Sequence, residues 1–392
     1  MATAQPPLKV LFFSPYFYPY ISGLTQFPYR FFSHAPENLE ATCLTFRHEN
    51  NLKQKDTIVH TAIIRMPFLF RVSKGFISPQ SLIFFWKELN RHDVVLLNLP
   101  SVEGVWLALF AWIKCKPIVS LLHCEVLLPP GVLNRMVNGI LNAGVWVQLV
   151  LSRRIIVYTT DYYADKPMYR PFRHKMQVIL PPVHTDQPDL TYLADLQHKK
   201  EGKKAIGFCG RIAYEKGITV LIDAVANRDD VMLFFAGPTG KDVVGEAQYY
   251  SHILRVLSAK KVPFYFCGLL EGPKLSAFYK ALDLLVLPSI NRTEAFGMVQ
   301  VEAMREGTPV VASNLPGVRI PIRMTHMGET AEPGNAEDLR NKMNTVLSER
   351  EKYTSKTHQR KVQSLFDPQK TYEKVYDLLL EALGGFTPAR TV

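Results

Sequence analysis

The chain has 392 residues and a mass of 44.6 kDa, more than the ~100 to 200 residues of an ordinary domain, which predicts two domains. Apolar residues make up 47% and charged residues 21%, a globular composition that excludes a disordered or collagenous chain. The net charge of +11 is uneven, because residues 1–180 hold 19 Lys and Arg against 10 Asp and Glu. A basic surface of this kind favours an anionic partner.

Apolar runs in the sequence are short. The longest, 104–113 and 144–151, fall below the ~18 to 20 residues that a membrane span needs. The apolar run after Lys9 is also too short for a secretory signal, so we expect a cytoplasmic protein. The cysteines lie far apart without a Cys-x-x-Cys pair, which favours small core residues over a zinc site or a disulfide framework.

The first half of the chain alternates short runs of Val, Ile, Leu and Phe with helix-length segments. This pattern predicts a parallel sheet covered by helices on both faces. The expected strands are 9–14, 41–46, 62–66, 93–99, 117–123, 155–159 and 177–180. A long apolar helix is expected to start near Val132 and to end before Arg153 and Arg154.

The second half repeats the same alternation after a break. Pro181, Pro182 and the polar segment up to Gly202 predict a hinge followed by an irregular connection, with a domain boundary near residue 182. The expected strands are 205–209, 231–236, 263–267, 284–288 and 309–313, with a helix at 218–227. Apolar residues at helical spacing, from Tyr372 to Leu383, predict a terminal helix.

The densest candidate site lies in residues 288–307, between two expected strands. Gly297 lets the backbone approach a ligand, and the N–H groups of a helix that begins near Met298 suit an anion such as phosphate. Glu294 and Glu302 repel phosphate but accept hydrogen bonds from hydroxyls. A ligand with sugars on both sides of a diphosphate would therefore give each carboxylate a partner.

Two cations, Arg211 and Lys216, follow the first strand of the second half. At that place they are suited to neutralise a diphosphate and to stabilise the charge that grows on a departing nucleotide. The sequence shows no Asp-x-Asp pair placed to hold a divalent ion against a diphosphate, so we expect neither a metal nor another cofactor.

Three ordered segments, 210–217, 288–307 and 307–317, resemble glycosyltransferase family 4 (glycosyl transferases group 1), which are retaining nucleotide-sugar enzymes of the GT-B fold. The resemblance extends from about Ala205 to Leu383 and is looser in the first half. It implies an α/β fold with two Rossmann-like, doubly wound domains facing a cleft. Residues 1–181 would bind the acceptor and 182–366 the nucleotide sugar, while the helix and tail at 367–392 would pack back on the N-terminal domain.

The resemblance also implies roles for individual residues. Glu294 would contact the transferred sugar and Glu302 the ribose, while Arg211 and Lys216 would hold the diphosphate. The implied catalytic residues are Glu294, Arg211, Lys216 and His123, and the implied donor-binding residues are Glu302, Gly23, Ala295, Phe296, Gly297, Met298, Val299, Gly237, Pro238, Leu269 and Leu270. In this family the donor phosphate helps to deprotonate the acceptor hydroxyl, so we assign no protein general base.

Each of these assignments has a plainer alternative. Glu294 and Glu302 could be exposed charges favoured by a helix N-terminus, and Arg211 and Lys216 solvated loop cations. His123, which ends an expected strand, could be a hydrogen-bonded structural residue. Gly23, in the loop after the first strand, could be a turn residue.

The resulting hypothesis is a hexosyltransferase that moves a sugar from a UDP- or GDP-linked donor to a hydroxyl of a glycan or lipid-linked acceptor, in cell-surface polysaccharide or glycolipid synthesis. The alternatives are a nucleotide-sugar epimerase or phosphorylase on the same fold, and a non-catalytic nucleotide-sugar-binding protein. A dinucleotide oxidoreductase fits less well because no Gly-x-Gly-x-x-Gly follows a strand.

A membrane partner is the last sequence-based hypothesis. Arg71 and Lys74 alternate with Phe68, Phe70 and Phe76, while Arg153 and Arg154 end the apolar helix that runs from about Val132. Together these residues suit an anionic leaflet at the inner face of the plasma membrane. The alternative is that these phenylalanines are core residues with a solvated rim of cations. We expect no nucleic-acid partner.

Overall fold

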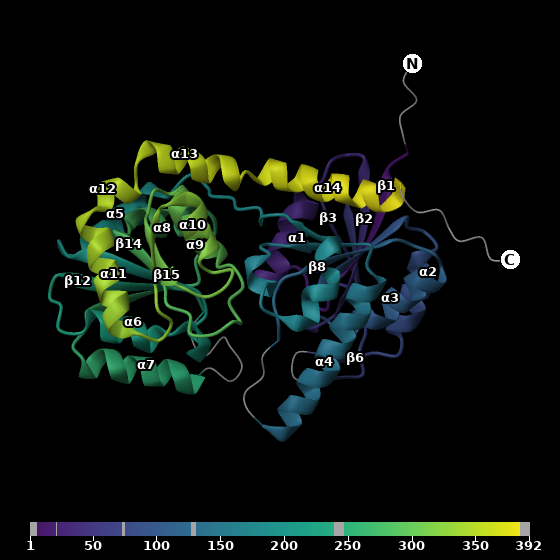
Figure 1. Ribbon diagram of the computed structural model, residues 1–392, viewed down its shortest axis with the longest axis horizontal. Coiled ribbons are helices and arrows are strands. Elements are labelled where there is room, and N and C mark those ends of the chain that lie inside the picture. Colours follow the sequence, from purple (N-terminus) through teal and green to yellow (C-terminus); the bar gives the residue numbers. More distant parts are fainter. Residues whose placement is uncertain (1–5, 21, 73–74, 127–130, 239–246, 385–392) are drawn as a thin grey trace, which may run out of the picture. The chain divides into compact units, whose positions relative to one another are not determined.

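The computed structural model describes residues 6–20, 22–72, 75–126, 131–238 and 247–384, and these form two α/β units (Figure 1). The first unit comprises the described residues up to Pro182 together with those from Pro368 onward. The second unit is Val183–Asp367. Each unit is a Rossmann-like sheet with helices on both faces, which confirms the predicted fold class.

The first unit is built on an eight-stranded sheet with the order β10-β9-β8-β7-β1-β2-β4-β3. Its neighbouring strands are parallel except for the edge pair of β3 and β4, and β5 and β6 form a separate antiparallel pair. The strands are β1 (Leu8–Phe13), β2 (Leu39–Phe46), β3 (Lys55–Ile58), β4 (Thr61–Met66), β5 (Phe70–Val72), β6 (Gly75–Ile77), β7 (Val94–Leu99), β8 (Ile118–Leu122), β9 (Arg154–Val157) and β10 (Met176–Val178). The short strands β3, β5 and β6 were not predicted, because they lack the apolar run of a central strand.

The helices of the first unit lie on opposite faces of its sheet. The chain moves one way from β1 to β2 and the other way from β4 through β7 and β8 to β9. Right-handed crossovers therefore place α1 on one face and α2, α3 and α4 on the other. The helices are α1 (Gly23–Ser33), α2 (Ser81–Leu89), α3 (Gly104–Ile113), α4 (Val132–Leu151) and α14 (Pro368–Gly384), with 3-10 turns η1 (Asp161–Tyr163) and η2 (Pro167–Lys175).

The terminal helix α14 belongs to the first unit although it follows the second in sequence. The ring of Tyr372 packs against Phe31 of α1, and Thr371 donates a hydrogen bond to the carbonyl of Leu180 over 3.0 Å. Near its end, Glu381 pairs with Arg154 at 2.5 Å. The helix thus packs on the first unit, as predicted, and it covers the α1 side of the sheet.

The second unit has a six-stranded parallel sheet with the order β13-β12-β11-β14-β15-β16. Its strands are β11 (Lys204–Cys209), β12 (Val231–Ala236), β13 (Phe264–Gly268), β14 (Leu284–Leu287), β15 (Val310–Ser313) and β16 (Gly328–Ala331). Its helices are α5 (Leu190–Lys199), η3 (Tyr214–Lys216), α6 (Ile218–Val225), α7 (Ala247–Ala259), α8 (Gly272–Ala281), α9 (Met298–Arg305), α10 (Ile320–Thr325), α11 (Ala336–Ser348), α12 (Arg350–Tyr353) and α13 (Lys356–Leu365).

Two sequence-based expectations were wrong. The connection before β11 is not irregular, because Asp189 caps α5 by accepting the Tyr192 N–H and the helix buries Leu196. Among the cysteines, Cys43 is buried but Cys115 is exposed and the other three are partly exposed. Cys115 occupies the turn after α3 with a positive φ of 53°, which turns its side chain out of the core.

Candidate active site

The candidate site lies where the strand order of the second unit reverses, between β11 and β14. The two strands pair in parallel, so the loops 210–217 and 288–297 leave the same edge of the sheet. These loops touch: the N–H of Ile290 donates to the carbonyl of Glu215 over 3.0 Å. In sheets of this topology, ligands bind at the carboxyl ends of the strands beside such a reversal.

Lys216 and Glu294 form the closest charged contact of the site. The Lys216 Nζ lies 2.5 Å from the Glu294 Oε2, and the two side chains are 20% and 16% exposed. The 3-10 turn η3 presents the lysine, while the side chain of Asn291 accepts hydrogen bonds from Thr293 and shapes the loop before the glutamate. The structure therefore joins a predicted cation directly to a predicted carboxylate.

Gly217 makes this approach of the two loops possible. Its φ of +66° is in the left-handed region, and a Cβ there would lie 2.0 Å from the carbonyl oxygen of Pro288. Any side chain at this position would push the 288–297 loop away from η3. The second glycine of the segment 210–217 is thus a packing requirement of the site.

Arg211, the other predicted cation, has a partner on its own loop. One of its guanidinium nitrogens donates to the Glu215 Oε1 over 2.7 Å, and the arginine side chain is 40% exposed. Glu215 was not singled out in the sequence, although its position four residues after an arginine is a usual spacing for an ion pair. The acid fixes the arginine at the surface of the loop.

Glu302 lies on α9 and is buried, with 5% of its surface exposed. Its Oε2 accepts a hydrogen bond from the hydroxyl of Tyr279, a buried residue of α8, over 2.8 Å. Cys209, at the end of β11, lies among Tyr279, Glu302 and Lys216, and burial raises the pKa of its thiol to about 12. The thiol therefore stays protonated beside the two charged residues.

Tyr279 is the functional candidate that the sequence did not reveal. It falls on the buried stripe of an amphipathic helix, a pattern that predicts only a core residue. Its position next to Glu302 depends on the packing of α8 against α9, which no local motif encodes.

The segment after Glu294 divides into core residues and a helix start. Ala295 and Phe296 are buried, whereas Met298 and Val299 are half-buried and form the first residues of α9. Gly297 precedes them with a φ of +76°, and a Cβ there would lie 2.4 Å from Leu287. The backbone N–H groups at this helix start, rather than the side chains before it, are the groups suited to an anion.

The ends of β12 and β13 adjoin the same edge of the sheet. Gly237 donates its N–H to the carbonyl of Gly268 over 2.8 Å, and a Cβ on Gly237 would lie 2.1 Å from the carbonyl oxygen of Gly210. Pro238 follows on the loop, and the described part of this loop ends there. Beyond β13, Leu269 is 61% exposed and Leu270 half-buried, so apolar surface is available at this end of the sheet.

In the first unit, His123 follows β8 and is buried. Its Nδ1 lies 2.5 Å from the Tyr158 hydroxyl and its Nε2 lies 2.6 Å from the Asn98 Oδ1. Asn98 in turn donates from its Nδ2 to the Ser14 Oγ and to the carbonyl of Leu24. Both ring nitrogens therefore have partners inside the unit.

Gly23 is the first residue of α1, one residue before the carbonyl that Asn98 contacts. A Cβ on Gly23 would meet no atom within 4 Å, so packing does not require glycine there. Among the residues that the structure describes, no group of three or more His, Cys, Asp or Glu is arranged to hold a metal ion.

A family model for "Glycosyl transferases group 1" matches residues 195–362, which lie in the second unit. An uncharacterized glycosyltransferase of Methanocaldococcus jannaschii is 33% identical over 153 residues, or 38% of this chain and 37% of that protein. The sulfoquinovosyl transferase SQD2 of Arabidopsis thaliana is 30% identical over 159 residues, or 40% of this chain and 29% of that protein. The matched regions thus span only 37% and 29% of the length of these two relatives.

The similarity to solved structures extends over nearly the whole chain. Anabaena HepE in complex with UDP and glucose gives a TM-score of 0.74 at 19% identity, covering 95% of this chain and all of that one. The sucrose-phosphate synthase of Thermosynechococcus elongatus gives 0.74 at 17% identity, covering 96% and 99%. These similarities confirm the fold, and the family match confirms the resemblance predicted from the motifs. Residues 195–362 are thus similar to the group 1 glycosyltransferases, and the match covers less than half of the chain.

Proposed function

We propose that this protein transfers a sugar from a nucleoside diphosphate sugar to a hydroxyl of its acceptor, with retention of anomeric configuration. The main support is the contact of Lys216 with Glu294 beside the start of α9. A diphosphate needs cations and N–H groups, whereas sugar hydroxyls need carboxylates, and a nucleotide sugar carries both kinds of group.

Lys216 serves the leaving group in this proposal. An ammonium has three N–H donors, so the lysine can keep its contact with Glu294 and still bind a diphosphate oxygen. A cation already in place costs no reorganisation when negative charge grows on the departing nucleotide. Glu294, held by the same ammonium, accepts a hydrogen bond from a hydroxyl of the transferred sugar.

Glu302 serves the nucleoside. Tyr279 fixes one carboxylate oxygen of Glu302 in a buried setting, so the orientation of the carboxylate is set before a ribose hydroxyl binds. The N–H groups at the start of α9 and the exposed guanidinium of Arg211 add donors for the phosphates. In this proposal the donor phosphate assists deprotonation of the acceptor hydroxyl, and the reaction needs neither a metal nor another cofactor.

UDP-linked sugars are the first donors to test, because HepE was solved with UDP and glucose and a trehalose-6-phosphate protein of E. coli with UDP-2-fluoro glucose. We propose a glycan or lipid-linked acceptor of cell-surface polysaccharide or glycolipid synthesis, held by the basic first unit in the cytoplasm.

The test has two stages. A thermal-shift panel of UDP, GDP and their sugars should show stabilisation by one nucleotide, since a ligand at 100 times its dissociation constant adds about 2.7 kcal/mol. The stabilising sugar nucleotide is then incubated with candidate acceptors, and free nucleotide and glycosylated product are measured.

Three outcomes would contradict glycosyl transfer. Turnover of donor alone to an isomer would indicate an epimerase, and product formation with free phosphate a phosphorylase. Donor binding with no nucleotide release under any acceptor would indicate a non-catalytic binding protein.

A further inference from the structure

All four tryptophans of the chain lie on one face of the first unit. Trp86 is on α2, Trp106 and Trp112 are on α3 and Trp146 is on α4, and each is 46 to 63% exposed. Helix α3 packs against both α2 and α4, so the three helices form a continuous layer. An exposed tryptophan is uncommon on a soluble surface, and four on adjacent helices indicate a partner.

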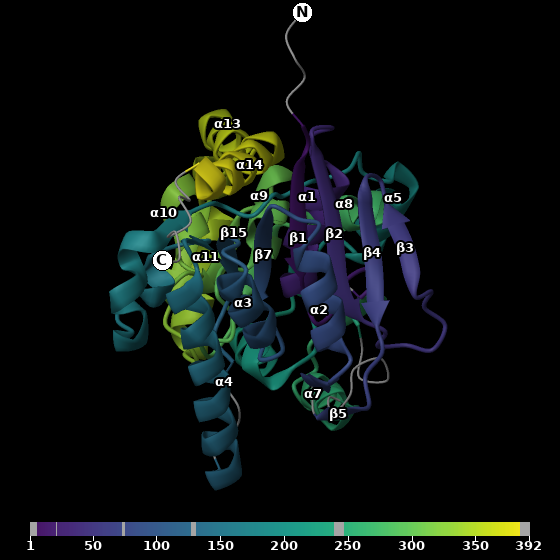
Figure 2. The same ribbon diagram turned by 90° about the vertical axis from the view of Figure 1, so that its right-hand side faces the viewer.

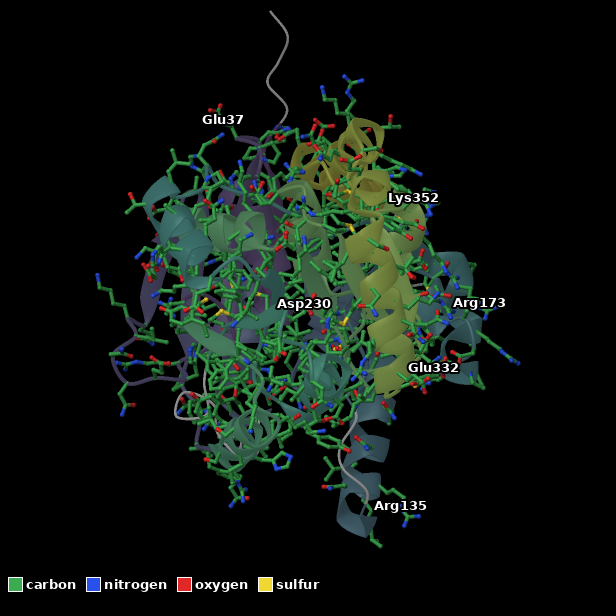
Figure 3. All side chains as sticks on the ribbon, turned by 90° about the vertical axis from the view of Figure 1, so that its left-hand side faces the viewer. Glu37, Arg135, Arg173, Asp230, Glu332 and Lys352 are labelled. Carbon is green, nitrogen blue, oxygen red and sulfur yellow. The ribbon has the colours of Figure 1, made fainter. Side chains whose placement is uncertain are left out.

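Helix α4 extends this apolar surface. Val132, Met136, Ile140 and Trp146 are exposed along the outside of the helix, and in two perpendicular views α4 reaches past the other elements of the first unit (Figures 1 and 2). Its only charged residue is Arg135, which lies at the projecting end of the helix and points away from the ribbon (Figure 3). In the described part of the chain, no helix is both long and apolar enough to pass through a bilayer.

We call this surface the tryptophan face and define it by its exposed members, which are Ile83, Trp86, Trp106, Trp112, Ile113, Val132, Met136, Ile140 and Trp146. The phenylalanines considered in the sequence analysis are not part of it. Phe76 is a core residue stacked on Phe46, and Lys74 lies outside the described residues.

The charges of α2, α3 and α4 have one sign at the surface. Lys87 on α2 and Arg135 on α4 are exposed, and the ammonium of Lys114, just after α3, lies 3.7 Å from the ring centre of Trp86. Arg91, just after α2, is also exposed and pairs with Glu88 at 3.3 Å. The two acidic residues of this region, Glu88 and Glu103, make contacts within the unit.

Glu88 is buried, and the Oε1 of Glu103 accepts the N–H of Phe76 over 2.6 Å. Among the described residues of α2, α3 and α4, every exposed charge is therefore a cation.

We propose that the tryptophan face docks on the surface of an anionic lipid bilayer. Tryptophan favours the boundary between headgroups and acyl chains, where its ring is buried and its N–H stays hydrated. The apolar side of a helix such as α4 can enter this boundary without crossing it. Cations at the rim of an apolar face complement acidic headgroups.

A second copy of the chain is a weaker candidate for the same face. A twofold dimer would oppose two identical patches whose exposed charges, such as Lys87 and Arg135, are both positive. An anionic bilayer attracts the same residues, so the charge favours lipid over self-association.

Vesicle binding by the full-length protein tests this proposal. Vesicles of equal parts phosphatidylcholine and phosphatidylglycerol should co-float the protein and shift its fluorescence to shorter wavelength, and phosphatidylcholine vesicles should do so much less. Since all tryptophans are on the face, fluorescence quenching by brominated lipids reports on this surface alone. Added salt should release the protein.

Three variants decide whether the face itself binds. Trp106→Gln with Trp112→Gln should lower the partition coefficient about tenfold or more. Lys87→Gln with Arg135→Gln should lower it about fivefold for each removed cation at low salt. Leu380→Gln, an exposed apolar residue of α14 on the opposite side of the sheet, is the matched control and should bind as the unaltered protein does.

Because the altered residues are exposed, circular dichroism and thermal melting should be unchanged in all three variants. Failure of the unaltered protein to bind anionic vesicles would overturn the proposal. So would full binding by the tryptophan variant, or a stable dimer in sedimentation that the same substitutions dissociate. The donor-site chemistry plays no part in this test.

Discussion

The ammonium of Lys216 lies 2.5 Å from a carboxylate oxygen of Glu294, 78 positions later in the chain. The contact joins the loop after β11 to the loop after β14, the two strands between which the sheet order reverses. The pair links a group suited to phosphate with a group suited to a sugar hydroxyl. Substitutions of its two members should therefore have different effects.

Glu294→Gln should keep or improve the affinity for the nucleoside diphosphate while transfer falls about a hundredfold or more. The reason is that the substitution removes a negative charge next to the proposed phosphate position and weakens the contact with the transferred sugar. Lys216→Met should lower both the nucleotide affinity and kcat. Calorimetry with the nucleotide and steady-state transfer rates measure the two effects.

Lys260→Met is a matched control, because Lys260 pairs with Asp223 at 2.8 Å elsewhere in the second unit. It should leave nucleotide binding unchanged. Equal losses of nucleotide affinity in the Lys216 and Glu294 variants would show that the pair acts only as a structural link between the loops.

Tyr279→Phe should raise the KM for the donor and destabilise the second unit by about 1 to 3 kcal/mol, because it removes a donor from the buried carboxylate of Glu302. Tyr353→Phe is the comparison, since the Tyr353 hydroxyl donates to Glu329 over 2.7 Å away from the site. Both variants should lose stability, but only the first should lose donor affinity. If the donor KM of Tyr279→Phe were unchanged, the hydrogen bond between Tyr279 and Glu302 would not contribute to nucleotide binding.

The sequence predicted most central strands, and it singled out Lys216 and Glu294, which the structure brings into contact. Both the strands and these loop residues leave local patterns. A strand such as β12 is an unbroken apolar run, and Glu294 and Lys216 stand in loops beside glycines. Tyr279 and Glu215 were missed because their roles depend on neighbours that tertiary packing supplies.

The tryptophan face is another feature that depends on tertiary packing and that the sequence did not predict. The apolar residues from Val132 onward predicted the helix α4, but periodicity alone does not tell a buried apolar side from an exposed one. Only the packing of α3 between α2 and α4 shows which side faces out. Helix α5 was missed for the opposite reason, since its polar residues outnumber its buried ones.

Gly237→Ala and Gly23→Ala should have opposite effects on stability. A Cβ at Gly237 would lie 2.1 Å from the carbonyl of Gly210 at a φ of +140°, so we expect a loss of about 2 kcal/mol or more. At Gly23 a Cβ meets nothing within 4 Å, and alanine at the helix start should gain about 0.4 to 1 kcal/mol. Urea unfolding measures both changes. A loss of transfer in Gly23→Ala without a loss of stability would support its predicted contact with the donor.

Tyr372→Ala should destabilise the first unit by about 3 to 5 kcal/mol, because the ring of this α14 residue is buried against Phe31 and His34. In calorimetry of the full chain, nucleotide should raise the melting temperature of the second unit, as the proposed function requires. The substitution should lower the melting temperature of the other transition, which nucleotide does not shift. Leu380→Ala, on the exposed side of the same helix, should change neither transition. A shift of the nucleotide-sensitive transition instead would contradict the assignment of α14 to the first unit.

His123→Gln tests whether the histidine is a neutral structural residue. Asn98 offers its oxygen to the Nε2 of His123, so this nitrogen carries the proton and Nδ1 accepts from the Tyr158 hydroxyl.

Burial lowers the pKa of His123 to about 3. In the unfolded chain this histidine takes up a proton near pH 6.5, whereas in the folded chain it stays neutral at that pH. The free energy of unfolding therefore falls as the pH drops below that value. The glutamine variant lacks this group, so its stability deficit relative to the unaltered protein should shrink by about 2 kcal/mol between pH 7 and pH 5. Urea unfolding at the two pH values gives the deficit directly. A deficit that stays constant would mean that His123 titrates normally, in a site more open than its two short hydrogen bonds indicate.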